Sequence, residues 1–233
     1  MQLLQMCPSE LEQARQNKAI LMFGVGSIEY HGSQLPLGTD FFLVDGVIQA
    51  VEKRLPDKVV AAPSLAVSPT GFAVSGPQAG TVDIGVDAFM HHCADLLDSY
   101  ERMGFHKIVI LVHHQGGNII PMLKTVLTKH TMYEKKAELG EGWWTDKRPG
   151  AVRRAPVELL PAMLDTHYFG GHGGKGETEG VLAIRPDLVH LEKVTNAEEE
   201  PFWNKSVTEV DEAAAKEQFA DLIRLWIEKI ESM

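Results

Sequence analysis

The chain has 233 residues, enough for one α/β domain or at most two small ones, and 44% of them are hydrophobic, as in ordinary globular proteins. Lys and Arg number 22 and Asp and Glu number 32, giving a net charge of −10, and no basic stretch supplies the clustered cations that nucleic-acid binding requires. Because no apolar run reaches about 18 residues and the first residues show no signal-peptide pattern, we expect a cytoplasmic protein with neither a nucleic-acid nor a membrane partner.

Short apolar runs alternate along the chain with segments in which apolar side chains recur at helical spacing. The short runs predict strands at 19–25, 58–65 and 107–112. The helical spacing predicts helices at 44–55, 89–104, 119–127 and 209–232. Strands that alternate with helices indicate the α/β class: a single domain over residues 1–233, with a parallel-rich central sheet flanked by helices on both faces. In such sheets, ligands bind beyond the carboxyl ends of the strands.

The first stretch with chemical potential is GSIEYHGSQLPLGTD at residues 26–40, which directly follows the first predicted strand. Glu29 and His31 are two positions apart, so their side chains point the same way in an extended segment. Asp40 follows after a turn. All three are ligand types for divalent ions such as zinc or manganese, and an aspartate between two ions can bridge them. The alternative is that Glu29 and Asp40 cap helices or bind loop amides.

The third predicted strand leads into HHQGGN at residues 113–118, so we expect this turn at the same edge of the sheet as the first stretch. A glycine-rich turn between a strand and a helix can instead hold a phosphate at the helix N-terminus. The sequence contains neither the phosphate-loop motif nor the dinucleotide-binding motif, which makes that interpretation weak. For either histidine alone, a buried and hydrogen-bonded side chain is the alternative.

Residues 131–150 are polar and glycine-punctuated around Trp143 and Trp144, and we interpret them as a long loop. The two tryptophans either cover a substrate as part of a lid or pack on a neighbouring subunit or on the domain itself.

A third glycine-rich stretch, FGGHGGKGETEG at residues 169–180, contains His172 and Glu177. A histidine beside an activated water is a natural proton shuttle, because its pKa lies near neutrality. The alternative is a surface loop with incidental histidine and glutamate. The G-x-S-x-G motif of serine hydrolases is absent. The three clusters therefore favour metal-activated water over covalent catalysis.

Four segments, in this order and spacing, resemble the creatininase (creatinine amidohydrolase) family over about residues 18–192. They are GSIEYHGSQLPLGTD, AGTVDIGVDAF at 79–89, HHQGGN, and HGGKGETEGVLAIRP. The resemblance implies the family's α/β fold, a site for two divalent ions, zinc or manganese, and assembly into a homo-oligomer, with a hexamer favoured. It also implies roles for five residues: Glu29, His31, Asp40 and Glu177 as metal ligands, with Asp40 as the bridge, and His172 as a catalytic residue beside the reacting centre.

The chain departs from the family pattern at HHQGGN and at two positions of the first stretch. Aligned without a gap, Gln115 stands where the family has a metal-binding histidine. Gln115 is then the ligand, and His114, Trp143 and Trp144 are expected to contact the substrate; the alternative is that His114 turns in as the ligand. In the first stretch, Gln34 replaces a histidine and Tyr30 replaces a glutamine.

The family resemblance implies a metal-dependent hydrolase that opens a small, polar, cyclic substrate at an amide bond. Within the family, the alternative is an inosose-type hydrolase, which opens a cyclic ketone by C–C cleavage during inositol catabolism. The alternative of another class is a non-catalytic small-molecule binding protein with a degenerate metal site.

Overall fold

The computed structural model of the chain describes residues 1–72, 79–114, 116, 119–127, 157–164, 168–194 and 207–233. Its centre is a sheet of four parallel strands in the order β2-β1-β3-β4. The strands are β1 (Ile20–Val25), β2 (Val59–Ala61), β3 (Ile108–Val112) and β4 (Val157–Pro161). The predicted α/β class with a parallel sheet is confirmed.

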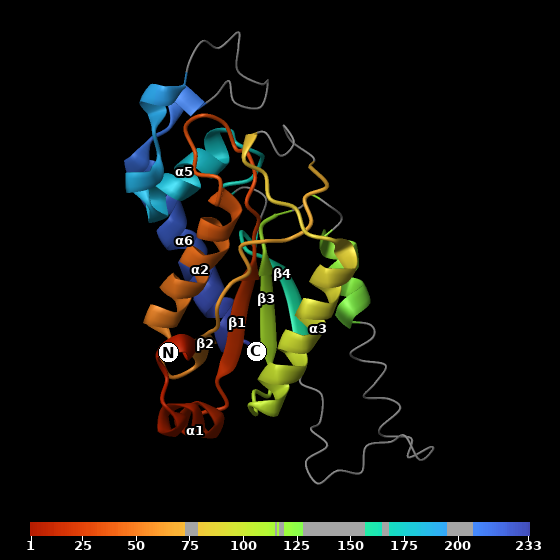
Figure 1. Ribbon diagram of the computed structural model, residues 1–233. Helices are drawn as coiled ribbons and strands as arrows, with labels where there is room; N and C mark the ends of the chain where they lie inside the picture. The colour runs from red at the N-terminus through yellow and green to blue at the C-terminus, as the bar shows by residue number, and fades with distance from the viewer. Residues whose placement is uncertain (73–78, 115, 117–118, 128–156, 165–167, 195–206) are drawn as a thin grey trace.

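Helices cover both faces of the sheet (Figure 1). One face carries α2 (Thr39–Arg54), α5 (Lys175–Ile184) and α6 (Glu212–Glu231), and the other carries α3 (Val86–Arg102) and a helical segment at 119–127. The helix α1 (Pro8–Gln16) precedes β1 and adds Ala14 to the second face. Short 3-10 helices lie at Leu3–Gln5, Pro186–Leu188, Leu191–Lys193 and Val207–Glu209.

The central strands have apolar side chains on both faces, as expected of a parallel sheet between two helical layers. In β1, Ile20 and Met22 pack with α2, α5 and α6, whereas Leu21, Phe23 and Val25 pack with α1 and α3. Adjacent residues of a strand point to opposite faces, so β1 contributes to two separate hydrophobic cores. The neighbouring strand β3 is divided between the cores in the same way.

Several element boundaries differ from those the sequence predicts, and one strand was not predicted. The strand expected at 58–65 ends at Ala61, because Pro63 has no N–H to donate to a sheet. The helix expected at 209–232 spans Glu212–Glu231, and Asp211 caps it by accepting hydrogen bonds from the N–H groups of Ala213 and Ala214. The strand β4 lies in a segment where no strand was predicted.

The order of the strands determines where a ligand can bind. The connection through α2 takes the chain from β1 to β2 on one side, and the connection through α3 returns it to β3 on the other side of β1. Beyond the carboxyl ends of β1 and β3 the connections therefore diverge, and such switch points are the usual ligand sites of open α/β sheets.

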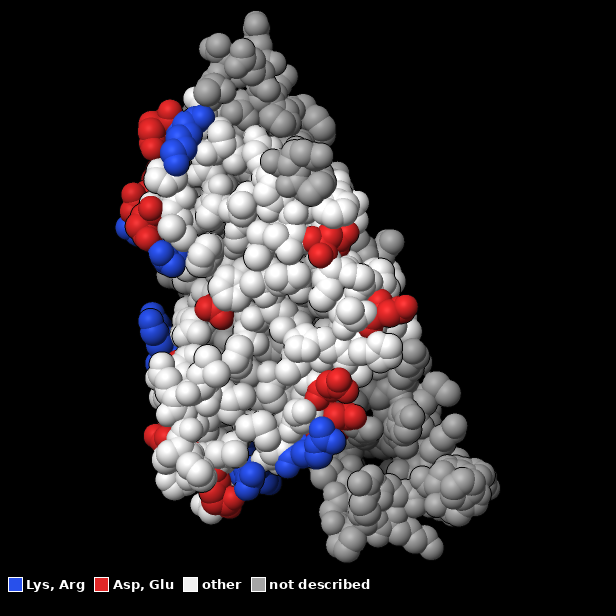
Figure 2. Space-filling model, in the orientation of Figure 1, with Lys and Arg blue, Asp and Glu red and all other residues white. Residues whose placement is uncertain are grey.

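Charged side chains on the face shown in Figure 2 lie mainly toward its margins, and basic and acidic groups are mixed there. Within the described ranges, no helix combines the length and the apolar character needed to cross a membrane.

Candidate metal centre

The loop after β1 places Glu29 and His31 at the switch point. Ile28 pairs with Val82, and the N–H of Glu29 donates to the carbonyl of Leu37, so the loop folds back on itself. At Gly26 the strand exit meets the start of α2 so closely that a Cβ there would lie 2.5 Å from the backbone nitrogen of Phe41. Glycine at this position therefore allows β1 to deliver the loop directly beside Asp40.

Asp40 and Glu177 both lie in the first turn of a helix, α2 and α5 respectively. The positive end of the helix dipole stabilises a carboxylate at this position. Glu177 Oε2 also accepts a hydrogen bond of 2.6 Å from the N–H of Gly173. Both carboxylates are thus held in place while they are almost fully buried.

The two oxygens of Asp40 face two different sets of side chains. Oδ1 lies 3.4 Å from His31 Nε2, whereas Oδ2 lies 3.0 Å from His114 Nδ1 and accepts a 2.6 Å hydrogen bond from Ser27. Two triads of potential ligand atoms, each within 4.8 Å of one another, share this carboxylate: Glu29, Asp40 and His114, and His31, Asp40 and Glu177. One aspartate between two triads is the arrangement that a bridging carboxylate requires.

His31 supplies the clearest indication that the cluster fits a cation. Its Nδ1–H donates to the carbonyl of Glu29 at 3.0 Å, so Nε2 is the ring nitrogen that faces the cluster. Nε2 is fully buried without a hydrogen-bond partner, 3.4 Å from Asp40, 3.8 Å from Glu177 and 3.9 Å from Glu29. A divalent ion there would satisfy this nitrogen together with the carboxylates of Asp40 and Glu177.

His114 is oriented in the same way from the end of β3. Its Nε2–H donates to the carbonyl of Pro69 at 3.3 Å, so Nδ1 faces Glu29 at 3.2 Å and Asp40 at 3.0 Å. A carbonyl that accepts from the other ring nitrogen in this way fixes the tautomer of a metal-binding histidine. The structure therefore places the side chain of His114 among the potential ligands.

The charges of the cluster balance through the imidazoles when no cation is bound. Burial lowers the pKa of His31, but the carboxylates of Asp40 and Glu177 outweigh burial and raise the pKa to about 9. Burial likewise opposes the charge on His114, while hydrogen bonds with Asp40 and Glu29 raise its pKa to about 10. Burial raises the pKa of Asp40, yet His31 and His114 hold it well below its usual range. Protonated imidazoles thus substitute for the positive charge that a divalent ion would supply.

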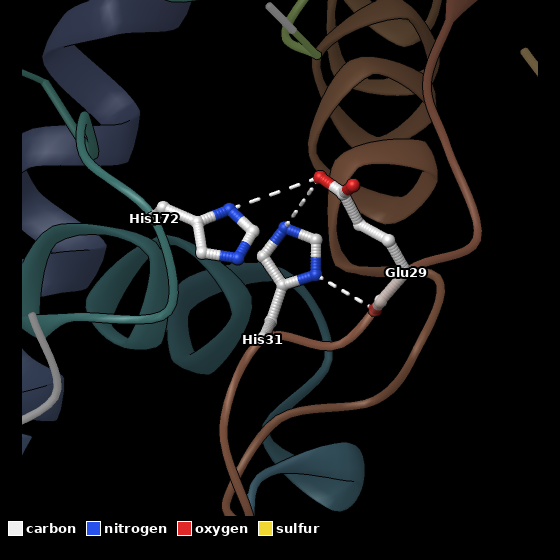
Figure 3. Close-up of side chains that lie close together, drawn as sticks. All are labelled: Glu29, His31 and His172. Carbon is white, nitrogen blue, oxygen red and sulfur yellow. Dashed lines mark hydrogen bonds and ion pairs between the residues drawn. The ribbon is translucent and has the colours of Figure 1, made fainter. Parts of the chain in front are cut away.

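The ring of His172 lies beside that of His31 and faces Glu29 (Figure 3). Its Nε2–H donates to the carbonyl of Tyr30 at 2.8 Å, and its Nδ1 lies 3.7 Å from Glu29 Oε1. The ring stands 4.3 Å from that of His31, centroid to centroid. Its side chain is 27% exposed, whereas that of His31 is fully buried, so His172 is the histidine that an incoming molecule can meet.

The sequence analysis gave no role to His113, which the structure brings into the cluster. Its Nε2 lies 2.8 Å from Glu177 Oε1 and 3.8 Å from Asp40 Oδ1, and its side chain is only 8% exposed. Consecutive residues of a strand point to opposite faces, which argues against two inward histidines. The signal that could have identified it is its position as the first residue after β3, at the edge where ligands were expected.

The structure brings together six of the residues named from the sequence: Glu29, His31, Asp40, His114, His172 and Glu177. Three others, Gln115, Trp143 and Trp144, lie outside the described residues, as does the whole expected lid at 131–150. Gln34 lies behind the cluster, where its side-chain N–H₂ donates to the carbonyl of Gly173 at 2.7 Å and to Thr178 Oγ1 at 3.2 Å.

Fold and site together define an α/β protein with a candidate two-metal centre at the switch point of a parallel sheet. A sequence profile of the creatininase family, described as creatinine amidohydrolase, matches residues 5–222, and the chain belongs to this family.

Three curated relatives are similar at low identity. Creatinine amidohydrolase of Pseudomonas putida is 25% identical over 203 residues, which cover 83% of this chain and 75% of the relative. The mycofactocin precursor peptide peptidase of Mycobacterium ulcerans is 25% identical, covering 75% of this chain and 62% of the relative. The 3-dehydro-scyllo-inosose hydrolase of Thermotoga maritima is 24% identical, covering 78% of this chain and 56% of the relative.

Solved structures share the fold over nearly the whole chain. A creatinine amidohydrolase (creatininase) structure has a TM-score of 0.73 at 18% identity, covering 99% of this chain and 96% of its own. A mutant creatininase described as Zn–Zn type has a TM-score of 0.72, and a structure described as creatininase Mn has 0.73, both at 17% identity and covering 99% of this chain and 97% of their own.

Proposed function

We propose that the protein is a metal-dependent hydrolase that uses two divalent ions, zinc or manganese, to open a small, polar, cyclic substrate. The observation that carries the proposal is Asp40, whose two oxygens face separate triads of buried ligand types. The solved creatininases described as Zn–Zn type and Mn support the choice of ions.

Each ion would have its own set of side chains around the shared aspartate. Glu29, Asp40 and His114 would hold one ion, and His31, Asp40 and Glu177 would hold the other. In the ungapped alignment, the family's metal-binding histidine falls at Gln115. In this assignment His114 supplies that imidazole instead. Two divalent ions so close together polarise a substrate carbonyl and make water a nucleophile at neutral pH.

The chain's own residues supply orientation and proton transfer. Because Nε2–H of His172 donates to Tyr30, the ring presents Nδ1 to the cluster and can exchange a proton there with a substrate atom. The carbonyls of Glu29 and Pro69 keep His31 and His114 in the tautomers that face inward. The burial of Asp40, Glu29 and Glu177 excludes water from their oxygens, which strengthens their attraction for cations.

The scissile bond is proposed to be a cyclic amide, as the name of the Pseudomonas putida relative indicates for that protein. A cyclic ketone opened by C–C cleavage is the second candidate, because a relative of nearly equal identity is an inosose hydrolase. Both reactions begin with attack of water on a carbonyl carbon, so the same centre can serve either.

The experiment is to prepare the metal-free protein, load it with zinc or manganese, and follow ring opening by NMR. Creatinine and other small cyclic amides form one panel, and inososes form the other. Turnover of one panel, abolished by chelation and restored by metal, would support the proposal and select the bond. Bound metal without turnover of either panel would contradict it and favour a binding protein.

A further inference from the structure

The side chain of His113 has no role in the proposed two-ion scheme, yet it lies within the cluster, in contact with two of its carboxylates. Its Nε2 faces Glu177 Oε1 at 2.8 Å and Asp40 Oδ1 at 3.8 Å. Its side chain is 8% exposed. A buried imidazole between two carboxylates needs an explanation.

The two consecutive histidines fall on opposite sides of Asp40. His114 faces Oδ2, which also faces the Glu29 triad, whereas His113 faces Oδ1, which also faces His31 at 3.4 Å. His113 therefore contacts Asp40 on the side that faces His31, and it also contacts Glu177 of the same triad. Both imidazoles are turned toward Asp40, one to each of its oxygens.

Around Asp40 Oδ1, the contacts link His31, Asp40, His113 and Glu177. His31 Nε2 lies 3.4 Å from Asp40 and 3.8 Å from Glu177 Oε2, and His113 Nε2 lies 3.8 Å from Asp40 and 2.8 Å from Glu177 Oε1. Ligand atoms at about 2.0–2.2 Å from one ion lie roughly 3–3.6 Å from each other in tetrahedral geometry. The observed separations scatter around this spacing.

We propose that His113 Nε2 is a fourth ligand of the ion held by His31, Asp40 and Glu177, so that the histidine pair after β3 serves one ion each. This inference rests on the proposed two-ion function. The ion at His113 then has two imidazoles, whereas the ion at His114 has one imidazole and the carboxylates of Glu29 and Asp40. Imidazole suits zinc better than it suits harder ions. The site with His31 and His113 therefore binds zinc more tightly than the site with His114.

The test is a zinc titration of the metal-free protein by calorimetry, with four variants. His113→Ala removes the imidazole, and His113→Gln places an amide N–H near the position of Nε2, within reach of Glu177, but offers a weaker ligand. His114→Ala removes the imidazole of the other triad. His91→Ala, on an exposed position of α3, is the matched control.

The unsubstituted protein and His91→Ala are expected to bind two zinc ions in two steps. Both His113 variants should lower the zinc affinity of the tighter step. The decrease should exceed the roughly 10–100-fold that follows loss of a residue that only hydrogen-bonds to a ligand. His114→Ala should weaken the other step. X-ray absorption at one equivalent of zinc should show one imidazole fewer in His113→Ala than in the unsubstituted protein.

Wild-type affinity of His113→Gln for both ions would overturn the inference, because His113 would then only orient Glu177. Weakening of the same step by His113→Ala and His114→Ala would overturn it too. If the unsubstituted protein binds two ions in either case, the proposed function stands without His113. Failure of the unsubstituted protein to bind zinc or manganese would overturn both.

Discussion

Asp40 is the residue on which the proposed centre depends most, because each of its oxygens faces a different triad. Asp40→Asn keeps the size of the side chain but removes its charge and one acceptor oxygen. We expect the zinc affinity of both steps to fall by at least about 100-fold, with loss of turnover. This exceeds the usual effect of replacing a residue that only hydrogen-bonds to a ligand.

Asp45→Asn is the control for this substitution. Asp45 lies on the same helix, half-buried, and accepts a hydrogen bond from Ser64 outside the cluster. Calorimetry should find two ions with unchanged affinity in Asp45→Asn. Full metal occupancy and turnover in Asp40→Asn would refute the bridging role.

His172 should affect the rate and not the ions. Its Nε2 is engaged with Tyr30 and its side chain is partly exposed, so His172→Ala removes a proton-transfer group at the mouth of the cluster. We expect turnover to fall by about 10²–10⁴, the usual size of general acid–base catalysis, with both ions retained. Loss of an ion in this variant would make His172 a ligand, and an unchanged rate would remove it from the mechanism.

Most of the cluster could be predicted from single residues, because their identity limits their chemistry. Glu29, His31 and Asp40 lie within one short stretch after a strand, and Glu177 lies in a glycine-rich stretch that lets the chain approach closely. His113 could not be assigned, because the period of two in a strand predicts only one inward histidine of a pair. The strand β3 ends at Val112, so this alternation does not constrain His113 and His114.

Among the elements, the start of α2 determines where Asp40 stands. A side chain at Gly26 would overlap the backbone of Phe41, which cannot move without shifting that helix. Gly26→Ser should therefore lower the free energy of unfolding by about 1–3 kcal/mol, the usual cost of overpacking. It should also weaken both metal-binding steps, since both triads include Asp40.

Gly85→Ser provides the control, because nothing lies within 4 Å of an added Cβ there and serine is a favourable residue before a helix. Chemical denaturation and calorimetry on both variants make the comparison. Equal stability and equal metal affinity of the two would show that the contact at Gly26 has no consequence for the centre.

The elements that sequence reasoning found are those with clear periodicity, such as β1, β3 and α6. It missed β4, whose VELLP sequence is short and ends in a proline, features that do not distinguish a strand from a loop. No helix was predicted within 169–180, because Gly176 and Gly180 have low helix propensity, whereas α5 begins at Lys175. Close packing explains these glycines: a Cβ at Gly176 would lie 2.3 Å from the carbonyl oxygen of Gly170.

On the scale of the whole molecule, exposed apolar side chains gather on segments joined by hydrogen bonds. Leu37 is 41% exposed, Phe72 45%, Val82 43% and Val86 44%, and their segments are linked through Ile28–Val82 pairing and a Thr70–Asp83 hydrogen bond. We expect these residues to contact another copy of the chain in a homo-oligomer, and sedimentation should give an oligomer mass, with a hexamer favoured.

Phe72→Asp combined with Val82→Asp should shift the protein toward smaller species. Leu4→Asp is the control, since Leu4 is 83% exposed on the N-terminal 3-10 helix, away from these segments. A monomer mass for the unsubstituted protein, or no change in the double variant, would contradict the expectation.

The fold should survive removal of the ions. Two hydrophobic cores hold the sheet, and protonated His31 and His114 balance the buried carboxylates when no cation is present. Chelated protein should keep its far-UV circular dichroism, and zinc at about 100 times its dissociation constant should add about 2.7 kcal/mol to the free energy of unfolding. An unfolded chelated chain would contradict this.

The placement of Asp40 and Glu177 in first helical turns bears on how the protein would bind its ions in a cell. Helix dipoles, Ser27 and Gly173 orient these carboxylates whether or not an ion is present, so loading follows folding and is reversible. Sites of this kind rank metals by affinity and by abundance together. Identical chains produced on different metal supplies would then share one fold and differ in catalytic behaviour. The ions bound in each preparation would reflect the metals present when it was made.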